Sequence, residues 1–229
     1  MSRLLTVASS CAVSVARLGA GYHVKHASEP PAKPLELYEF EACPYCRKVR
    51  ETLTELDLDA VVYPCPKGGV RFRPTVQEKT GKTQFPYLVD SNTDKALLES
   101  GDIVRYLTTT FGGKAPLVQR MGPLQGLASL FAFLARPGGM RARPSRQPEQ
   151  MLELWSFEAS PYCRIVREAL SVLEIPYHLH NVATGSPKRA AFVARSGKMM
   201  VPFLSDPNTG RDMFESADIV AYLEATYGG

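Results

Sequence analysis

The stretch of sequence that decides the fold occurs twice in this chain. Residues 41–51 read EACPYCRKVRE, and residues 158–168 read EASPYCRIVRE. The two stretches differ at two positions, and at one of them Cys43 of the first stretch is replaced by Ser160. A Cys-x-x-Cys pair, here Cys43 and Cys46, is typical of redox sites. The chain therefore contains one site twice, and the atom most suited to chemistry is changed in the second copy.

The repeat extends well beyond these stretches. Residues 35–60 align with residues 152–177 without a gap, and over half of the positions are identical. After one deletion, residues 81–113 align with residues 197–229. A repeat of this length indicates a duplicated structural unit.

We therefore expect two tandem domains, each of a size that a small domain can have. The first occupies residues 35–113 and the second residues 152–229. Residues 1–34 precede the first domain, and residues 114–151 join the two domains.

A weaker repeat precedes each domain. ARLGAG at residues 16–21 resembles ARPGGM at residues 135–140, so we expect a short helix, a glycine turn and a linker before each domain. Residues 1–28 contain several serines, Arg3 and Arg17, and no acidic residue, which is typical of an organelle transit peptide. A segment that recurs between the domains instead indicates retained structure. Both interpretations of residues 1–34 stay open.

The composition excludes several classes of protein. The chain has 229 residues and a net charge of +4, and much of the basic excess lies in residues 136–146. No aromatic residues interleave with that stretch, so a solvated linker is favoured over a nucleic-acid interface. The five cysteines are an odd number and scattered, which indicates a reducing compartment and no disulfide framework. No apolar run reaches the roughly 18 residues that a membrane span needs.

One segment of the linker has the pattern of an amphipathic helix. Its apolar residues recur at spacings of three and four: Leu124, Leu127, Leu130, Phe131 and Leu134. We expect this face to pack on a neighbouring domain. Shallow insertion at a membrane surface is the alternative.

Inside each domain the pattern predicts strand, helix and strand, followed by two strands and a helix. In the first copy the strands are expected at residues 35–40, 60–65, 85–90 and 96–99, and the helices at residues 47–56 and 101–111. Pro44 suits a first helical turn, since its missing N–H costs nothing there. Ser100 is expected to cap the last helix, and Gly112 to end it.

The position of Cys43 and Cys46 predicts dithiol chemistry. Cys43 would lie at a helix N-terminus, where backbone N–H groups and the helix dipole favour its thiolate. Cys46 would lie one turn later and could attack a mixed disulfide formed on Cys43. A zinc site would need two further ligands at suitable spacing, so no metal is expected. A structural pair of buried thiols is the remaining alternative. Cys65 is interpreted as a small buried hydrophobe rather than a regulatory thiol.

Three features together resemble a known family. They are CPYC after a strand, an X-Pro before a later strand, and ESGDI or ESADI at the start of a helix. This combination is similar to glutaredoxins and the glutathione S-transferase N-terminal domain, and the tandem arrangement is similar to proteins of photosynthetic organisms. The resemblance implies an α/β fold with two tandem thioredoxin-like domains of order βαβ–ββα. It also implies a chloroplast location, with mitochondrion or cytoplasm as alternatives.

The resemblance also implies glutathione as the ligand. Phe85-Pro86 and Val201-Pro202 would be cis peptides whose backbone pairs with the cysteinyl part of glutathione. Glu99-Ser100 and Glu215-Ser216 would hold its γ-glutamyl group. Ser160 corresponds to a serine that hydrogen-bonds the glutathione thiolate in some transferases. The alternative is that Ser100 and Ser216 only cap their helices.

Three functions follow, and the first is preferred. In it the protein is a glutathione-dependent thiol–disulfide oxidoreductase: Cys43 attacks disulfide or glutathionylated substrates, Cys46 resolves, and the second copy is degenerate. The second function is a non-enzymatic glutathione-binding or scaffolding protein that docks to a partner or a membrane. The third is a transferase that uses Ser160. Transferases of this family have a large helical C-terminal domain that this chain lacks, which argues against conjugation of bulky electrophiles.

Overall fold

The computed structural model describes residues 19–116 and 138–229. The first copy runs β1 (Leu35–Glu39), α2 (Pro44–Glu55), β2 (Ala60–Pro64), α3 (Arg73–Thr80), β3 (Tyr87–Asp90), β4 (Lys95–Leu97) and α4 (Ser100–Thr110). The second copy runs β5 (Leu152–Ser156), α6 (Pro161–Val172), β6 (Tyr177–Asn181), α7 (Arg189–Ser196), β7 (Phe203–Asp206), β8 (Arg211–Met213) and α8 (Ser216–Tyr227). The short helices expected before each domain, including the apolar face of residues 124–134, lie outside the described residues. Within the described ranges, none of the helices has the length and apolar character needed to cross a bilayer.

The α/β thioredoxin-like fold predicted for both copies is confirmed, with one addition. The sequence pattern did not predict α3 or α7, which lie between the second and third strands of each copy. Each of these eight-residue helices buries a single residue, Val76 in α3 and Phe192 in α7. With one buried position each, these short segments do not show the repeated apolar spacing that identifies an amphipathic helix.

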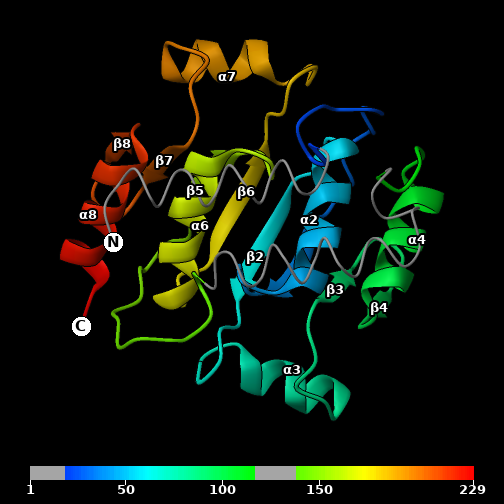
Figure 1. Ribbon diagram of the computed structural model, residues 1–229, viewed down its shortest axis with the longest axis horizontal. Coiled ribbons are helices and arrows are strands. Elements are labelled where there is room, and N and C mark those ends of the chain that lie inside the picture. The colour runs from blue at the N-terminus through cyan, green and yellow to red at the C-terminus, as the bar shows by residue number, and fades with distance from the viewer. Residues whose placement is uncertain (1–18, 117–137) are drawn as a thin grey trace.

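All eight strands belong to one sheet, in the order β4-β3-β1-β2-β6-β5-β7-β8. Within each copy the first two strands are parallel and the last two are added antiparallel. The copies join edge to edge, because β2 pairs antiparallel with β6 and Val61 lies opposite His178. Figure 1 shows β2 and β6 side by side at the middle of the molecule, with α3 and α7 at opposite ends of the view. The two copies are thus related by an approximate two-fold rotation about this junction.

The main hydrophobic core lies on one face of the sheet and continues across the junction. In the first copy it contains Leu35 and Leu37 of β1, Val49 and Leu53 of α2, and Ile103 and Leu107 of α4. The second copy has the matching set Leu152, Leu154, Val166, Leu170, Ile219 and Leu223. Val62 of β2 belongs to the second copy's core, while Ala60 of the same strand belongs to the first. The two cores therefore lie on the same side of the sheet, and α2, α4, α6 and α8 all cover that side.

Each linker crosses to the other copy. Thr184 of the second copy pairs with His23 of the first linker through two backbone hydrogen bonds of 2.8 and 3.1 Å. In the same way, Lys67 of the first copy pairs with Arg141 of the second linker. The two linkers therefore form equivalent bridges, and His23 corresponds to Arg141. This correspondence differs by one residue from the alignment of ARLGAG with ARPGGM.

A glycine is required in each linker where it passes the other copy. Gly21 has φ +75°, and a Cβ atom there would lie 2.8 Å from Cβ of Glu158. Gly139 has φ +79°, and a Cβ atom there would lie 2.8 Å from Cβ of Glu41. A left-handed backbone and such a close approach both favour glycine.

Candidate functional site

Cys43 lies at the N-terminus of α2, where the sequence predicted it. The structure places it at the N-cap position, and Pro44 occupies the first helical turn. The backbone N–H of Cys46 donates to Cys43 Sγ over 3.3 Å. The Cys43 thiol in turn faces the carbonyl oxygen of Phe85 at 3.9 Å. Both cysteines are buried and free. Cys43 is 4% exposed and Cys46 is fully buried, so Cys43 is the more accessible of the two.

The two thiols are shifted in opposite directions. A hydrogen bond from the Cys46 thiol lowers the pKa of Cys43, the N–H groups of Cys46 and Tyr45 lower it further, and burial opposes them. Burial raises the pKa of Cys46 well above its ordinary value, and its hydrogen bond to Cys43 adds to the effect. Of the two thiols, Cys43 is therefore the one that ionises more readily.

A buried carboxylate near this pair has no counterpart in the second copy. Glu39, at the end of β1, is buried and forms an ion pair with Arg50 of α2. Burial raises the pKa of Glu39 to about 7, and the charge of Glu41 adds to the shift while Arg50 opposes it. The second copy has Ser156 at the same position, where its hydroxyl accepts a hydrogen bond from Arg167 over 3.0 Å. The copies thus differ in this carboxylate as well as in the first cysteine.

Ser160 reproduces the geometry of Cys43 with oxygen in place of sulfur. It is the N-cap of α6, and the N–H of Cys163 donates to its Oγ over 3.3 Å. Serine is among the preferred N-cap residues because its hydroxyl satisfies a free N–H of the first turn. Ser160 therefore has a sufficient structural role as a cap.

A cavity of about 460 Å³ is lined by Tyr45 and Phe85, whose backbone groups face the Cys43 sulfur, although neither Cys43 nor Cys46 lines it. Its lining comes from five segments of the first copy: Phe40, Tyr45, Lys67, Arg73, Thr83, Gln84, Phe85, Leu98, Glu99 and Ser100. Three of the residues predicted to contact glutathione, Phe85, Glu99 and Ser100, are thus brought together here. The Phe85-Pro86 and Val201-Pro202 peptides are both cis, as the resemblance implied.

The predicted caps at Ser100 and Ser216 are wrong. Both serines are the first residues of their helices, and the N-cap positions belong to Glu99 and Glu215. Neither glutamate forms a side-chain capping hydrogen bond. At the cavity, the start of α4 therefore keeps backbone N–H groups that no cap satisfies, and such groups favour an anionic partner.

The sequence reasoning missed two cationic residues that line the cavity, Lys67 and Arg73. The Arg73 guanidinium lies 4.6 Å from the centre of the Phe85 ring and donates to the Cys65 carbonyl oxygen over 2.8 Å. The repeat could have identified Arg73, because the second copy has an arginine, Arg189, at the equivalent position. Arg189 starts α7 and donates to the carbonyl of Val182 in a similar way. Lys67 had no such signal, since Thr184 occupies its place.

The predicted ligand residues of the second copy, Val201, Pro202, Glu215 and Ser216, occupy equivalent positions with different surroundings. Glu215 has φ +65°, whereas Glu99 has φ −82°. Gln84 donates a hydrogen bond to Glu99 in the first copy, and the residue that replaces it in the second copy is Met200. The second site thus differs in backbone conformation and in polarity.

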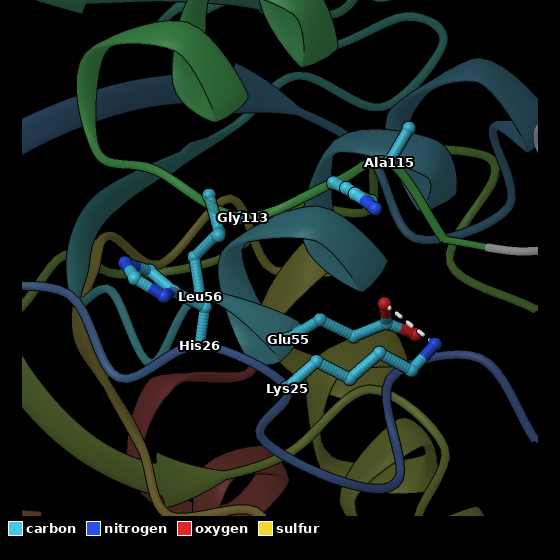
Figure 2. Close-up of a pocket in the computed structure, with 7 residues that line it drawn as sticks. Lys25, His26, Glu55, Leu56, Gly113 and Ala115 are labelled. Carbon is cyan, nitrogen blue, oxygen red and sulfur yellow. Dashed lines mark ion pairs between the residues drawn. The ribbon is translucent and has the colours of Figure 1, made fainter.

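A second cavity of about 450 Å³ lies at the other end of α2. Figure 2 shows Lys25 of the first linker extended along Glu55, and their ion pair measures 2.9 Å. His26 and Gly113 form the opposite wall. The described residues that line this cavity include no cysteine or serine, and the carboxylate of Glu55 is already paired. We therefore assign the candidate site to the cavity beside Cys43.

The comparisons with known proteins agree with the duplication. A family model described as "Glutathione S-transferase, N-terminal domain" matches residues 37–115 and again residues 154–229. No curated protein matches the sequence. One similar solved structure is titled "Leishmania TDR1 - a unique trimeric glutathione transferase"; it is 14% identical, with 85% of this chain and 67% of that chain covered, and has a TM-score of 0.32. That TM-score is too low to carry an argument about this chain, whereas the two family matches cover both copies of the repeat.

Proposed function

The chain belongs to the glutathione S-transferase N-terminal domain family and carries that domain twice, and on this basis we propose that it is a glutathione-dependent thiol–disulfide oxidoreductase. The chemistry takes place in the first copy. The observation that carries the proposal is the environment of Cys43: a sulfur at a helix N-terminus, hydrogen-bonded by Cys46 and with a lowered pKa, beside a cavity. An attacking thiol needs a substantial thiolate fraction near neutral pH.

The proposed reaction begins with Cys43 as a thiolate. Its sulfur attacks the disulfide of a glutathionylated substrate, a new S–S bond forms on Cys43, and the leaving thiolate takes a proton. Cys46 loses its proton as its sulfur attacks this mixed disulfide, which releases one thiol and leaves a Cys43–Cys46 disulfide. Two molecules of glutathione then reduce that disulfide and leave as oxidised glutathione, so the electrons balance.

Glutathione is anionic, and the cavity offers matching groups. The uncapped N–H groups of α4 at Ser100 suit a carboxylate, and Glu99 would accept from an ammonium group. Arg73 is positioned for a second carboxylate, since a guanidinium binds carboxylates through two N–H groups. Beside Cys43, the backbone at Phe85 would pair with the cysteinyl part of the ligand. These assignments support glutathione as the electron donor.

The second copy acts as a scaffold in this proposal. Ser160 cannot form a disulfide with Cys163, and its hydroxyl already caps α6. The second copy also covers the edge of β2 through β6. An exposed strand edge favours aggregation. Covering the edge of β2 is therefore a structural role that the second copy has without any catalytic activity.

The test is a glutathione-linked assay with a glutathionylated peptide as substrate. Wild type is compared with Cys43→Ser and Cys46→Ser. Cys43→Ser is a well-matched control, because Ser160 shows that serine caps this helix in the same geometry. We expect Cys43→Ser to lose all turnover. In Cys46→Ser mixed with the peptide before glutathione is added, the peptide's glutathione moiety should stay on Cys43, and added glutathione should release it as oxidised glutathione. Equal turnover in wild type and Cys43→Ser would refute the oxidoreductase, and the scaffolding function would then be preferred.

A further inference from the structure

The loop that follows β2 is held at the cavity by the second linker. The N–H of Lys67 donates to the carbonyl of Met140 over 2.7 Å, and the N–H of Ala142 donates to the carbonyl of Lys67 over 2.9 Å. These two bonds place Lys67 opposite Arg141 in a parallel β-bridge. Both backbone groups of Lys67 are thus bound by the linker, which holds this residue at the cavity's edge.

The bridge also fixes where the side chain of Arg141 lies. Residues directly opposite each other in a β-bridge direct their side chains to the same face. Lys67 lines the cavity, so Arg141 lies beside Lys67 on the cavity side of the linker. Both residues are exposed, and within residues 19–116 and 138–229 neither one forms an ion pair with a carboxylate. Two adjacent positive charges therefore face solvent at the edge of the candidate site's cavity.

The second copy provides an internal comparison. The residues at the equivalent bridge are Thr184 and His23, joined by the same pair of backbone hydrogen bonds. The backbone arrangement is therefore common to both copies, and the two full positive charges occur only beside the copy that has the cysteine pair. A purely structural role of the linker would not require this difference, because the backbone alone makes the bridge.

We propose that Lys67 and Arg141 form a cationic rim that selects protein or peptide disulfides carrying carboxylates next to the reacting sulfur. This inference rests on the proposed function and names the substrate class of the same site. It also assigns a role to Arg141, which belongs to the basic stretch of the second linker. Exposed charges of this kind accelerate encounter with partners of opposite charge and are screened by salt.

The carboxylates in question belong to the substrate and not to glutathione. Arg73 and the start of α4 lie inside the cavity and are the groups assigned to glutathione, whereas Lys67 and Arg141 extend the site outward along the linker. A change at Arg141 should therefore alter the KM for the peptide substrate and leave the KM for glutathione unchanged. That difference separates the two sources of carboxylate.

The experiment measures kcat/KM for three glutathionylated substrates: an acidic peptide, a basic peptide of equal length, and 2-mercaptoethanol as a small neutral thiol. The variant is Arg141→Glu, and the matched control is Arg211→Glu, an exposed arginine of β8 in the second copy. We expect Arg141→Glu to reduce kcat/KM for the acidic peptide about tenfold, a typical size for an electrostatic change in encounter rate. The basic peptide should improve, and the small substrate should not change. Added salt should remove the wild type's preference for the acidic peptide.

The outcomes separate this inference from the proposed function. If wild type reduces all three substrates and Arg141→Glu has the same relative kcat/KM values for them, the rim has no role in substrate selection. The proposed oxidoreductase function is then retained. If no substrate is reduced, the oxidoreductase fails, and fluorescence anisotropy of the labelled acidic peptide still tests the rim: equal affinity for wild type and Arg141→Glu overturns it. A single-stranded oligonucleotide that binds as tightly as the acidic peptide would also overturn it, since the rim would then be a general polyanion surface.

Discussion

Arg50 Nε donates to Glu158 Oε2 over 2.9 Å, although the two residues are 108 positions apart in the chain. The symmetry-equivalent contact joins Arg167 Nε and Glu41 Oε2 at 3.0 Å. All four side chains are buried, and all four belong to the repeated stretches that carry the cysteine motifs. The same eleven residues therefore build both the candidate site and the contact between the copies.

Removing the charge of Glu158 should strongly destabilise the protein. Glu158 pairs with both Arg50 and Arg167, as Glu41 also does, and Arg47 and Arg164 lie close to it. In Glu158→Gln these buried guanidinium groups lose one of their compensating charges, and breaking a buried pair in this way costs about 3–5 kcal/mol. Urea denaturation measures the change in the free energy of unfolding.

The control for this prediction is Asp212→Asn. Asp212 pairs with Arg195 at 2.6 Å on the surface, where an ion pair contributes about 0–1 kcal/mol. If Glu158→Gln costs no more than Asp212→Asn, the buried pairs do not hold the copies together.

The two copies should unfold in one transition, because they share one sheet and strand β2 contributes residues to the cores of both copies. The chain's single tryptophan, Trp155, lies in the second copy, so its fluorescence reports on that copy alone. Far-ultraviolet circular dichroism reports on both. We expect the two denaturation curves to coincide. A fluorescence curve displaced from the dichroism curve would show that the copies unfold separately.

Cys43 should be alkylated before Cys46 and Cys65. Its lowered pKa increases the thiolate fraction at neutral pH, while burial raises the pKa values of Cys46 and Cys65. Brief treatment with iodoacetamide from pH 5 to 9, followed by peptide mass spectrometry, should give a Cys43 labelling midpoint below that of free cysteine. Faster labelling of Cys46 would reverse the roles proposed for the two thiols.

Glu39 should make the protein more stable at mildly acidic pH than at alkaline pH. Its pKa rises from an ordinary 4.5 to about 7 on folding, so between these values the folded state binds more protons than the unfolded state. This contribution is complete below about pH 4.5 and is lost as the pH rises through 7. Denaturation at pH 5.5 and 8 should show the loss in wild type and a smaller one in Glu39→Gln. Equal losses in both proteins would contradict the prediction.

The first linker should stabilise the folded protein. Gly21 N–H donates to Glu55 over 3.2 Å, Lys25 pairs with the same carboxylate, and His23 bridges to Thr184. A chain that begins at Pro30 loses all three contacts, whereas one that begins at Gly19 keeps them. We expect a lower Tm for the shorter chain, by about 2–4 °C for each kcal/mol lost. Intact mass of the protein from its source then tests the transit-peptide interpretation, which a start near Pro30 would support.

Much of the fold and part of the site could be predicted from the sequence. Period-two strands, the helix after Pro44, and the cysteines at its start are local patterns, and the repeat allowed each pattern to be checked against a second copy. The prediction was incomplete where local signals are weak. Helix α3 buries only Val76, and Lys67 reaches the cavity only because the second linker bonds to it.

The sequence alone determined that this chain has two thioredoxin-like units and that only the first has a cysteine pair, because strand and helix periods and the Cys-x-x-Cys spacing are properties of neighbouring residues. The tertiary structure decided how the units are joined. Pairing of β2 with β6 uses backbone groups that every strand has, so the pattern of side chains does not predict this pairing. The partner of Arg50 is a carboxylate in the other copy, and Arg141 comes to lie beside Lys67 only after the linker has crossed the junction. Both relationships depend on which surfaces are left to be buried once each unit has folded.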